Sequence, residues 1–171
     1  MNDKQGFIDQ TGKEVIPLKY DEAEDFSEGL AKVKLNDKQG FIDQTGKEVI
    51  PLKYDYAEDF SEGFAKVKLN DKQGFIDKTG KEVIPLKYDE VENFWEGLAK
   101  VALNDKYGFI DKTGKEVIPL KYDKAEDFGG GFAKVELSFY IDKQGNEYSK
   151  EEAVKKGYKE RLSIDQILDL L

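Results

Sequence analysis

The sequence contains no cysteine and no histidine. Without cysteine there are no disulfides, thiolate metal sites or nucleophilic thiols, and without both residues the usual nucleophile–base pairs of enzymes cannot be built. No apolar run approaches the roughly 18 residues of a membrane-spanning helix. Clusters of lysine and arginine are also absent, and the formal net charge is −9, from 36 acidic and 27 basic residues. We therefore expect neither nucleic acid nor an anionic membrane as a partner.

Proline is scarce, but its positions are regular because the sequence repeats every 34 residues. All four prolines fall at one equivalent position of the repeat: Pro17, Pro51, Pro85 and Pro119. Four copies open at Gly6, Gly40, Gly74 and Gly108, and a partial fifth copy begins at Phe139. Such a fixed period is the sequence signature of a repeat architecture. We assign 1–145 to the repeat array and 146–171 to a separate C-terminal segment.

The period alone does not fix the fold, because helical tetratricopeptide units have the same length. Three regularly placed glycines in each copy interrupt every window in which apolar residues could follow a helical spacing. The segment 64–69 instead alternates apolar and charged residues, as in a half-buried antiparallel strand. We predict an all-β protein, an open tandem array of antiparallel β-meander or hairpin repeats. The irregular spacing of Tyr54, Ala57 and Phe60 predicts a bulged strand over 53–60.

Each copy contains one clear turn signal, shown here for the second copy. Asp43 precedes Gly46 by three residues, which is typical of a type I turn followed by a bulge with glycine in the left-handed conformation. The flanking strand should place Phe41 and Asp43 on one face and Ile42 on the other. Pro51 has no N–H to donate, so it should end the second strand or lie at an open edge. The equivalent aspartates are therefore predicted to cap turns: Asp9, Asp43, Asp77 and Asp111.

The C-terminal segment differs from the repeats. Ser149 and Glu152 have the spacing of a capping box, and a second such box spans 163–166. The apolar residues of the last segment lie at helical spacing: Ile164, Ile167, Leu168 and Leu171. We predict two short helices that form a C-terminal cap on the array.

The unit Gly-Phe-Ile-Asp-x-x-Gly-Lys-x-Val-Ile-Pro-x-x-Tyr-Asp, followed by Phe-Ser-Glu-Gly-Leu/Phe-Ala-x-Val, resembles the bacterial WG-repeat family, also called the KWG-repeat family. The resemblance covers roughly 1–145. It implies a β-repeat fold, but no activity, because the family is mostly without an assigned one. The tryptophan that names the family precedes the opening glycine. This chain has other residues there: Gln5, Gln39, Gln73 and Tyr107.

The sequence does not favour catalysis or metal binding. Acidic clusters recur in every copy, whereas an active site is normally a single constellation in one pocket. We therefore expect no enzyme activity, no catalytic residue, no metal and no cofactor. The segment 55–59 with Glu62 could bind calcium through oxygen ligands, but we interpret it as a solvated edge that prevents association. The recurring Phe and Tyr residues are interpreted as core layers, although stacked aromatics also form sugar-binding grooves.

A repeat array presents a long surface with periodic groups, and such surfaces suit extended partners. We predict a non-enzymatic binding or scaffolding module for a protein or another extended ligand. The alternatives are a cell-envelope glycan-binding module and a consensus-like scaffold without a ligand. The residues that vary between copies are expected to be exposed, and the candidate ligand contacts are Tyr56, Trp95 and Tyr107. Since Met1–Gly6 already belongs to a repeat and no signal peptide precedes it, a cytoplasmic location is expected.

Overall fold

The computed structural model describes residues 3–141, 146–149, 152 and 155–156. The chain is all-β and is built from antiparallel sheets that repeat along the sequence. The first sheet has two strands, β1 (Gln5–Ile8) and β2 (Glu14–Tyr20). Three four-stranded sheets follow, and each is a meander in sequence order.

The second, third and fourth strands have 6, 6 and 7 residues in each of these three sheets, whereas the first strand has 6 residues in the first sheet and 2 in the other two. The first contains β3 (Glu22–Ser27), β4 (Leu30–Leu35), β5 (Lys38–Asp43) and β6 (Glu48–Tyr54). The second contains β7 (Tyr56–Ala57), β8 (Phe64–Leu69), β9 (Lys72–Asp77) and β10 (Glu82–Tyr88). The third contains β11 (Glu90–Val91), β12 (Leu98–Leu103), β13 (Lys106–Asp111) and β14 (Glu116–Tyr122). Two small sheets complete the chain: β15 (Lys124–Ala125) with β16 (Val135–Glu136), and β17 (Tyr140–Ile141) with β18 (Glu147–Tyr148).

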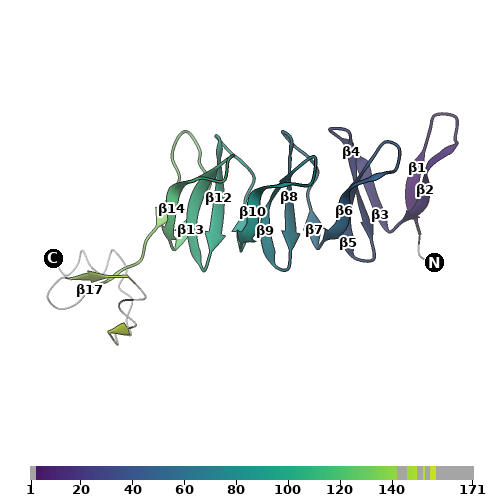
Figure 1. Cartoon of the computed structure of the whole chain (residues 1–171). Coiled ribbons are helices and arrows are strands. Elements are labelled where there is room, and N and C mark those ends of the chain that lie inside the picture. The colour runs from purple at the N-terminus through teal and green to yellow at the C-terminus, as the bar shows by residue number, and fades with distance from the viewer. Residues whose placement is uncertain (1–2, 142–145, 150–151, 153–154, 157–171) are drawn as a thin grey trace.

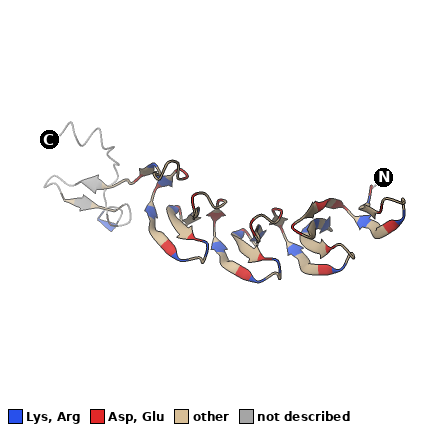
Figure 2. Ribbon diagram, turned by 90° about the horizontal axis from the view of Figure 1, so that it is seen from above, with Lys and Arg blue, Asp and Glu red and all other residues tan. Residues whose placement is uncertain are grey.

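The sheets follow one another in a single open row from the N-terminal to the C-terminal side (Figure 1). Seen from above, the row is gently curved (Figure 2). Each sheet begins about half a repeat after the glycine that opens the sequence copy, because the chain passes from one sheet to the next at Asp21, Asp55 and Asp89. The prediction of one bulged strand over 53–60 is therefore wrong. β6 ends at Tyr54, and β7 already belongs to the next sheet.

The predicted turn over 43–47 is confirmed. The Gly46 N–H donates to the Asp43 carbonyl at 2.9 Å, and Gly46 has a φ of 80°. Asp43 Oδ1 accepts from the Thr45 N–H at 2.9 Å, the Thr45 hydroxyl at 2.6 Å and the Lys47 N–H at 3.1 Å. These hydrogen bonds lower the pKa of Asp43, and the bond from the Thr45 hydroxyl contributes most. The same arrangement recurs at Asp9, Asp77 and Asp111.

The core lies between neighbouring sheets and not inside one sheet. Phe41, on β5, packs in one cluster with Ala65 and Val67 of the following sheet. Ile42, the next residue, packs in another cluster with Ile16 of the preceding sheet. Phe41 and Ile42 do alternate between faces, and both are buried because each sheet is covered on both sides. A sequence with only 39% hydrophobic residues can therefore form a core, since each layer is thin.

The recurring aromatic residues belong to these layers, as predicted. Tyr54 and Tyr88 are almost fully buried, and the Phe41 ring meets Phe60 edge to face with the centroids 4.8 Å apart. Pro51 lies within β6, which is the last strand of its sheet. Its missing N–H therefore removes no bond from a central strand, in agreement with the predicted open edge.

An aspartate ties each pair of neighbouring sheets together. At the last of these positions, Asp123 accepts from Lys106 Nζ at 2.5 Å and from the Ser138 N–H at 2.6 Å. Burial raises the pKa of Asp123, but the bonds from Lys106 and Ser138 outweigh it and hold the pKa at about 2. Asp55 has equivalent partners in Lys38 and in the N–H of Asn70. The pKa of Asp55 is likewise lowered, chiefly by Lys38.

Replacing Asp123 with asparagine should therefore destabilise the protein in a pH-dependent way. The shift of its pKa from 3.8 to about 2 corresponds to about 2 kcal/mol at neutral pH. The folded pKa lies below the unfolded one, so this contribution is complete above roughly pH 4 and is lost as the pH falls toward 2. Urea unfolding of Asp123→Asn and the parent should differ at pH 7 and converge near pH 2. A difference that persists at pH 2 would contradict this assignment.

A matched control for this experiment is Asp71→Asn. The Asp71 side chain is 93% exposed and pairs with Lys68, so its replacement should change the free energy of unfolding by less than about 0.5 kcal/mol at either pH. Asparagine also tolerates the positive φ of 61° at this position.

The predicted helical cap is not supported. Every element with defined bounds in the described part of the chain is a strand, and helical backbone is assigned there only at Glu152 and Lys155. The predicted capping box is formed, because the Ser149 N–H donates to Glu152 Oε2 at 2.8 Å and the Glu152 N–H donates to Ser149 Oγ at 3.3 Å. One further backbone bond joins the Lys156 N–H to the Glu152 carbonyl. The second predicted helix, over 163–171, lies outside the described residues. Among the residues that the structure describes, no helix is long and apolar enough to cross a membrane.

Candidate binding surface

The structure does not bring the three candidate ligand contacts together. Trp95 is 63% exposed and Tyr56 is 47% exposed, as predicted for residues that vary between copies. Trp95 forms a bridge with Leu98 at the beginning of β12, whereas Tyr107 pairs with Ala102 near its end. Tyr56 lies on β7, in the preceding sheet. The three side chains therefore do not form one site.

Tyr107 has a structural partner in its own sheet. It is half-buried, and its hydroxyl donates to Glu90 Oε2 at 3.4 Å. Burial raises the pKa of Tyr107, and the charge of Glu90 adds to the increase. At the same position in the three earlier copies, a glutamine accepts a hydrogen bond from the first strand of the next sheet. Gln39 Oε1 accepts from the Ala57 N–H at 2.6 Å, and Gln73 Oε1 accepts from the Val91 N–H at 3.1 Å. In the copies with glutamine this position therefore joins neighbouring units, whereas Tyr107 contacts a residue of its own sheet.

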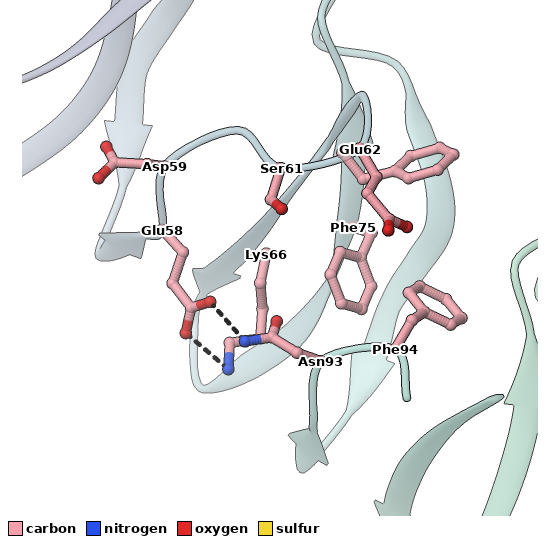
Figure 3. A pocket seen from close by; sticks show the side chains of 9 residues that line it. Glu58, Asp59, Ser61, Glu62, Lys66, Phe75, Asn93 and Phe94 are labelled. Atoms are coloured by element: carbon pink, nitrogen blue, oxygen red, sulfur yellow. Dashed lines mark hydrogen bonds and ion pairs between the residues drawn. The ribbon is translucent and has the colours of Figure 1, made fainter. Parts of the chain in front are cut away.

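A different surface carries concave sites. It is formed by the loops that connect the first and second strands of each sheet and by the residues flanking them, and we call it the loop ladder: 24–28, 58–62, 92–96 and 126–130. A pocket of about 190 Å³ lies between the second and third of these loops. Figure 3 shows Phe75 and Phe94 at one side of this pocket and Glu58 at the other.

The polar side of the pocket is held by three side chains. Glu58 Oε1 lies 2.7 Å from Lys66 Nζ, and Asn93 donates from Nδ2 to Glu58 Oε2 at 3.2 Å. Lys66 lies on β8 and Glu58 in the loop that precedes β8, whereas Asn93 lies in the equivalent loop of the next sheet, so the pocket spans a boundary between two units. Glu58 is thereby fixed in orientation, while Asp59 and Glu62 remain exposed at the rim.

A second pocket, of about 310 Å³, occupies the equivalent position one repeat further along. Glu92 replaces Glu58 in its lining, Trp95 replaces Ser61, and Phe128 replaces Phe94. Both pockets therefore combine aromatic rings with carboxylates. Their recurrence shows that the loop ladder is a periodic surface and not a single cavity.

The loop ladder carries an excess of negative charge within the described part of the chain. Several of its carboxylates pair with lysines, such as Glu62 with Lys112 at 2.6 Å and Asp127 with Lys100 at 3.2 Å. Glu28 pairs with Lys78 at 2.9 Å, and the hydrogen bond from that lysine is the main reason that the pKa of Glu28 is lowered. The carboxylates outnumber these lysines: Glu24, Asp25, Glu28, Glu58, Asp59, Glu62, Glu92, Glu96, Glu126 and Asp127.

The charged groups of the loop ladder lie at or near the surface of the described part of the chain. In the described residues, no group of three or more acidic side chains is gathered closely enough to hold a metal ion. The buried residues in that part of the chain are hydrophobic or glycine, with no buried charged side chain. The carboxylates of the loop ladder thus lie in or near solvent, where they can attract a charged partner.

Sequence reasoning found the exposed aromatics but missed the pockets. Phe75 was expected only as a recurring core residue, yet it lines the first pocket together with Phe64 and Phe94. Phe64 and Phe94 are half-buried, unlike Phe41. The available signal was the recurrence of a glutamate two residues before a phenylalanine in each loop, as in Glu58-Asp59-Phe60. That pattern alone does not reveal that loops from adjacent sheets lie side by side.

Comparison with known proteins supports the repeat assignment. A family model described as "WG containing repeat" matches four consecutive segments: 6–38, 40–72, 74–107 and 107–138. The matched segments begin at or next to the glycines that open the sequence copies, and together they cover more than half of the chain. No curated protein and no solved structure matches the chain.

Proposed function

The chain belongs to the family of WG containing repeats, and from this premise we propose that it is a non-enzymatic module that binds an extended, positively charged polypeptide along the loop ladder. The observation that carries the proposal is the recurrence of the same pocket, with aromatic and acidic lining, at two successive unit boundaries. A partner that extends over several units can repeat one contact at each boundary, which suits an unfolded segment more than a compact molecule.

The charge of the surface favours a cationic partner. The chain has a net charge of −9, and Asp59, Glu92 and Glu96 are exposed on successive loops. A lysine or arginine side chain can place its stem against Phe94 and its charged end near these carboxylates. Lys112 already illustrates this geometry, since its Nζ lies 6.0 Å from the centre of the Phe94 ring and pairs with Glu62. A partner cation would extend the same kind of contact to the neighbouring boundary.

Trp95 makes this proposal directly testable. It is the only tryptophan of the chain, it is exposed, and it lines the second pocket. A peptide of alternating lysine and valine, long enough to span two units, should therefore change the intrinsic fluorescence as it binds. Raising the salt concentration should weaken binding, because the contacts are between exposed charges. The same peptide with glutamate in place of lysine should have no effect.

Two variants localise the effect. Glu92→Gln removes a carboxylate that lines the second pocket and should weaken binding several-fold. Glu48→Gln removes an exposed carboxylate at the beginning of β6, outside the loop ladder, and should bind as the parent does. Equal affinity of both variants, or equal response to the lysine and glutamate peptides, would reject the proposed surface.

A glycan is the second candidate, because the exposed ring of Trp95 could stack on a sugar. Titration with a chito-oligosaccharide uses the same fluorescence signal and separates the two ligand classes. A response to the oligosaccharide that is insensitive to salt and to Glu92→Gln would favour the glycan. No response to either probe would favour a scaffold whose loop ladder binds no ligand.

A further inference from the structure

The two pockets of the loop ladder occupy equivalent positions, but their charges are balanced differently. In the first pocket, Glu58 lies 2.7 Å from Lys66 Nζ, and its second oxygen accepts a hydrogen bond from Asn93 (Figure 3). The two other carboxylates of that lining also pair with lysines, at 3.8 and 2.6 Å: Asp59 with Lys32, and Glu62 with Lys112. Every carboxylate of the first pocket therefore already has a cation of the chain beside it.

The second pocket has a carboxylate without such a cation. Asp127 occupies the position that Asn93 has in the first pocket, and an ionised carboxylate has no N–H to donate. Lys100, the equivalent of Lys66, lies 3.2 Å from Asp127 Oδ1. Among the residues that the structure describes, none pairs with the Glu92 carboxylate or donates a hydrogen bond to it. The charge of Glu92 is thus left for a ligand.

Three aromatic side chains line the same pocket, and two of them are supported by the core. Phe94 packs on Phe75 with the ring centroids 5.1 Å apart, and Phe128 packs on Phe109 with the centroids 4.9 Å apart. Phe75 and Phe109 are both buried. Since each supporting ring belongs to the core, the positions of Phe94 and Phe128 are set before a ligand binds.

Trp95 is the third aromatic residue, and it distinguishes this pocket from the first. The equivalent residues in the two earlier copies are Ser27 and Ser61. The Trp95 N–H donates to the Leu98 carbonyl at 2.8 Å, and the Leu98 N–H donates to the Trp95 carbonyl at 3.0 Å. The backbone of Trp95 is therefore fixed, whereas its side chain is largely exposed and available to a ligand.

Aromatic rings beside a carboxylate are typical of sites that bind quaternary ammonium groups. Such a group has no N–H and needs no acceptor, whereas the lysine ammonium has three donors that lose water when they face aromatic rings. We propose that the second pocket binds a quaternary ammonium group, presented as a trimethylated lysine of an extended polypeptide. The pocket volume of about 310 Å³ suits one such side chain, because ligand pockets range over roughly 300–1,000 Å³.

The surroundings of the pocket favour a methylated lysine over a phosphocholine group, which joins the same cation to a phosphate. Glu96, Glu126 and Asp127 are exposed on the two loops that form the pocket. Their negative charges repel a phosphate and attract further lysines of a polypeptide. This inference rests on the proposed function in taking the loop ladder as a surface for a polypeptide, and it adds the chemical group that the second pocket selects.

The test compares three labelled peptides by fluorescence anisotropy. They are the alternating lysine–valine peptide, the same peptide with trimethylated lysines, and a neutral version with a tert-butyl group in place of each trimethylammonium. The trimethylated peptide should bind at least about tenfold more tightly than either of the others, because only its cation is both charged and free of N–H groups. Equal affinity of the trimethylated and neutral peptides, or of the trimethylated and unmodified peptides, would overturn the inference.

Variants that copy residues of other units localise this preference without introducing a foreign side chain. Trp95→Ser reproduces the residue at Ser61 and should abolish the preference for the trimethylated peptide, whereas Trp95→Phe retains a ring and should keep part of it. Asp127→Asn reproduces the residue at Asn93, so its amide can donate to Glu92, and the preference should fall several-fold. The control Glu48→Gln, outside the loop ladder, should keep the full preference. An unchanged preference in Trp95→Ser would overturn the assignment to this pocket.

Tetramethylammonium separates this inference from the proposed function, because it tests the pocket without a polypeptide. It should change the fluorescence of Trp95 with saturation, and the ammonium ion at the same concentration should not. Binding of the lysine peptide without a response to tetramethylammonium would overturn the inference and leave the proposed function intact. A saturating response without binding of any peptide would support the quaternary ammonium site and reject the proposed function. Tighter binding of phosphocholine than of the trimethylated peptide would overturn the choice of ligand.

Discussion

Gly74→Ala is expected to destabilise the protein by about 3 kcal/mol or more, although it adds only one methyl group to the middle of a strand. The reason is the close approach of β9 and β10. A Cβ at Gly74 would lie 2.8 Å from the Pro85 carbonyl oxygen and closer still to that of Ile84. Both neighbours are backbone atoms, so they cannot rotate away as a side chain would. Urea unfolding followed by circular dichroism measures the effect.

The matched control is Gly129→Ala, which lies in the last loop of the loop ladder. A Cβ there meets nothing within 4 Å, and Gly129 is not among the glycines with positive φ. The free energy of unfolding should therefore change by less than about 0.5 kcal/mol. If Gly74→Ala unfolds at the same urea concentration as Gly129→Ala, the result would contradict the close approach of β9 and β10 at Gly74.

The sequence was sufficient to predict the elements whose cause is local. The Asp43 turn depends on a carboxylate and a glycine three residues apart, and both features are visible in the sequence. The strand 64–69 follows from its alternating pattern, and β8 has these same bounds. The burial of Tyr54 and Tyr88 followed from their recurrence in register. Period and pattern together therefore determined the class of fold.

The boundaries between sheets could not be predicted, because they depend on contacts between copies. A repeat has no unique starting point in sequence, and the chain enters a new sheet at Asp55 and not at the opening glycine. The pockets of the loop ladder could not be predicted for the same reason. Trp95 and Phe128 are 33 positions apart, and only the stacking of sheets places them around one pocket. Tyr107 was expected to be exposed, but its ring is half-buried beside Glu90.

A second large effect is expected from replacing one isoleucine that occurs in two strands of identical sequence. The stacking of sheets should make its contribution to stability differ between the two strands. β10 and β14 both have the sequence Glu-Val-Ile-Pro-Leu-Lys-Tyr. Ile84 is 0% exposed in the first of these strands, whereas Ile118 is half-buried in the second. The next hairpin turn explains the difference, because a Cβ at Gly114 would lie 3.1 Å from Ile84 Cδ1. No described residue in this chain provides the equivalent turn above Ile118.

Ile84→Ala should therefore lower the free energy of unfolding by about 2–5 kcal/mol, the usual cost of a cavity at a fully buried isoleucine. Ile118→Ala should cost less than half as much, because part of its side chain is already in water. Both losses are measured by urea unfolding. Since the two strands are identical in sequence, intrinsic strand propensity cancels in the comparison. Equal losses of unfolding free energy for the two variants would show that the isoleucines are stabilised within their own sheets. That result would contradict a core that lies between neighbouring sheets.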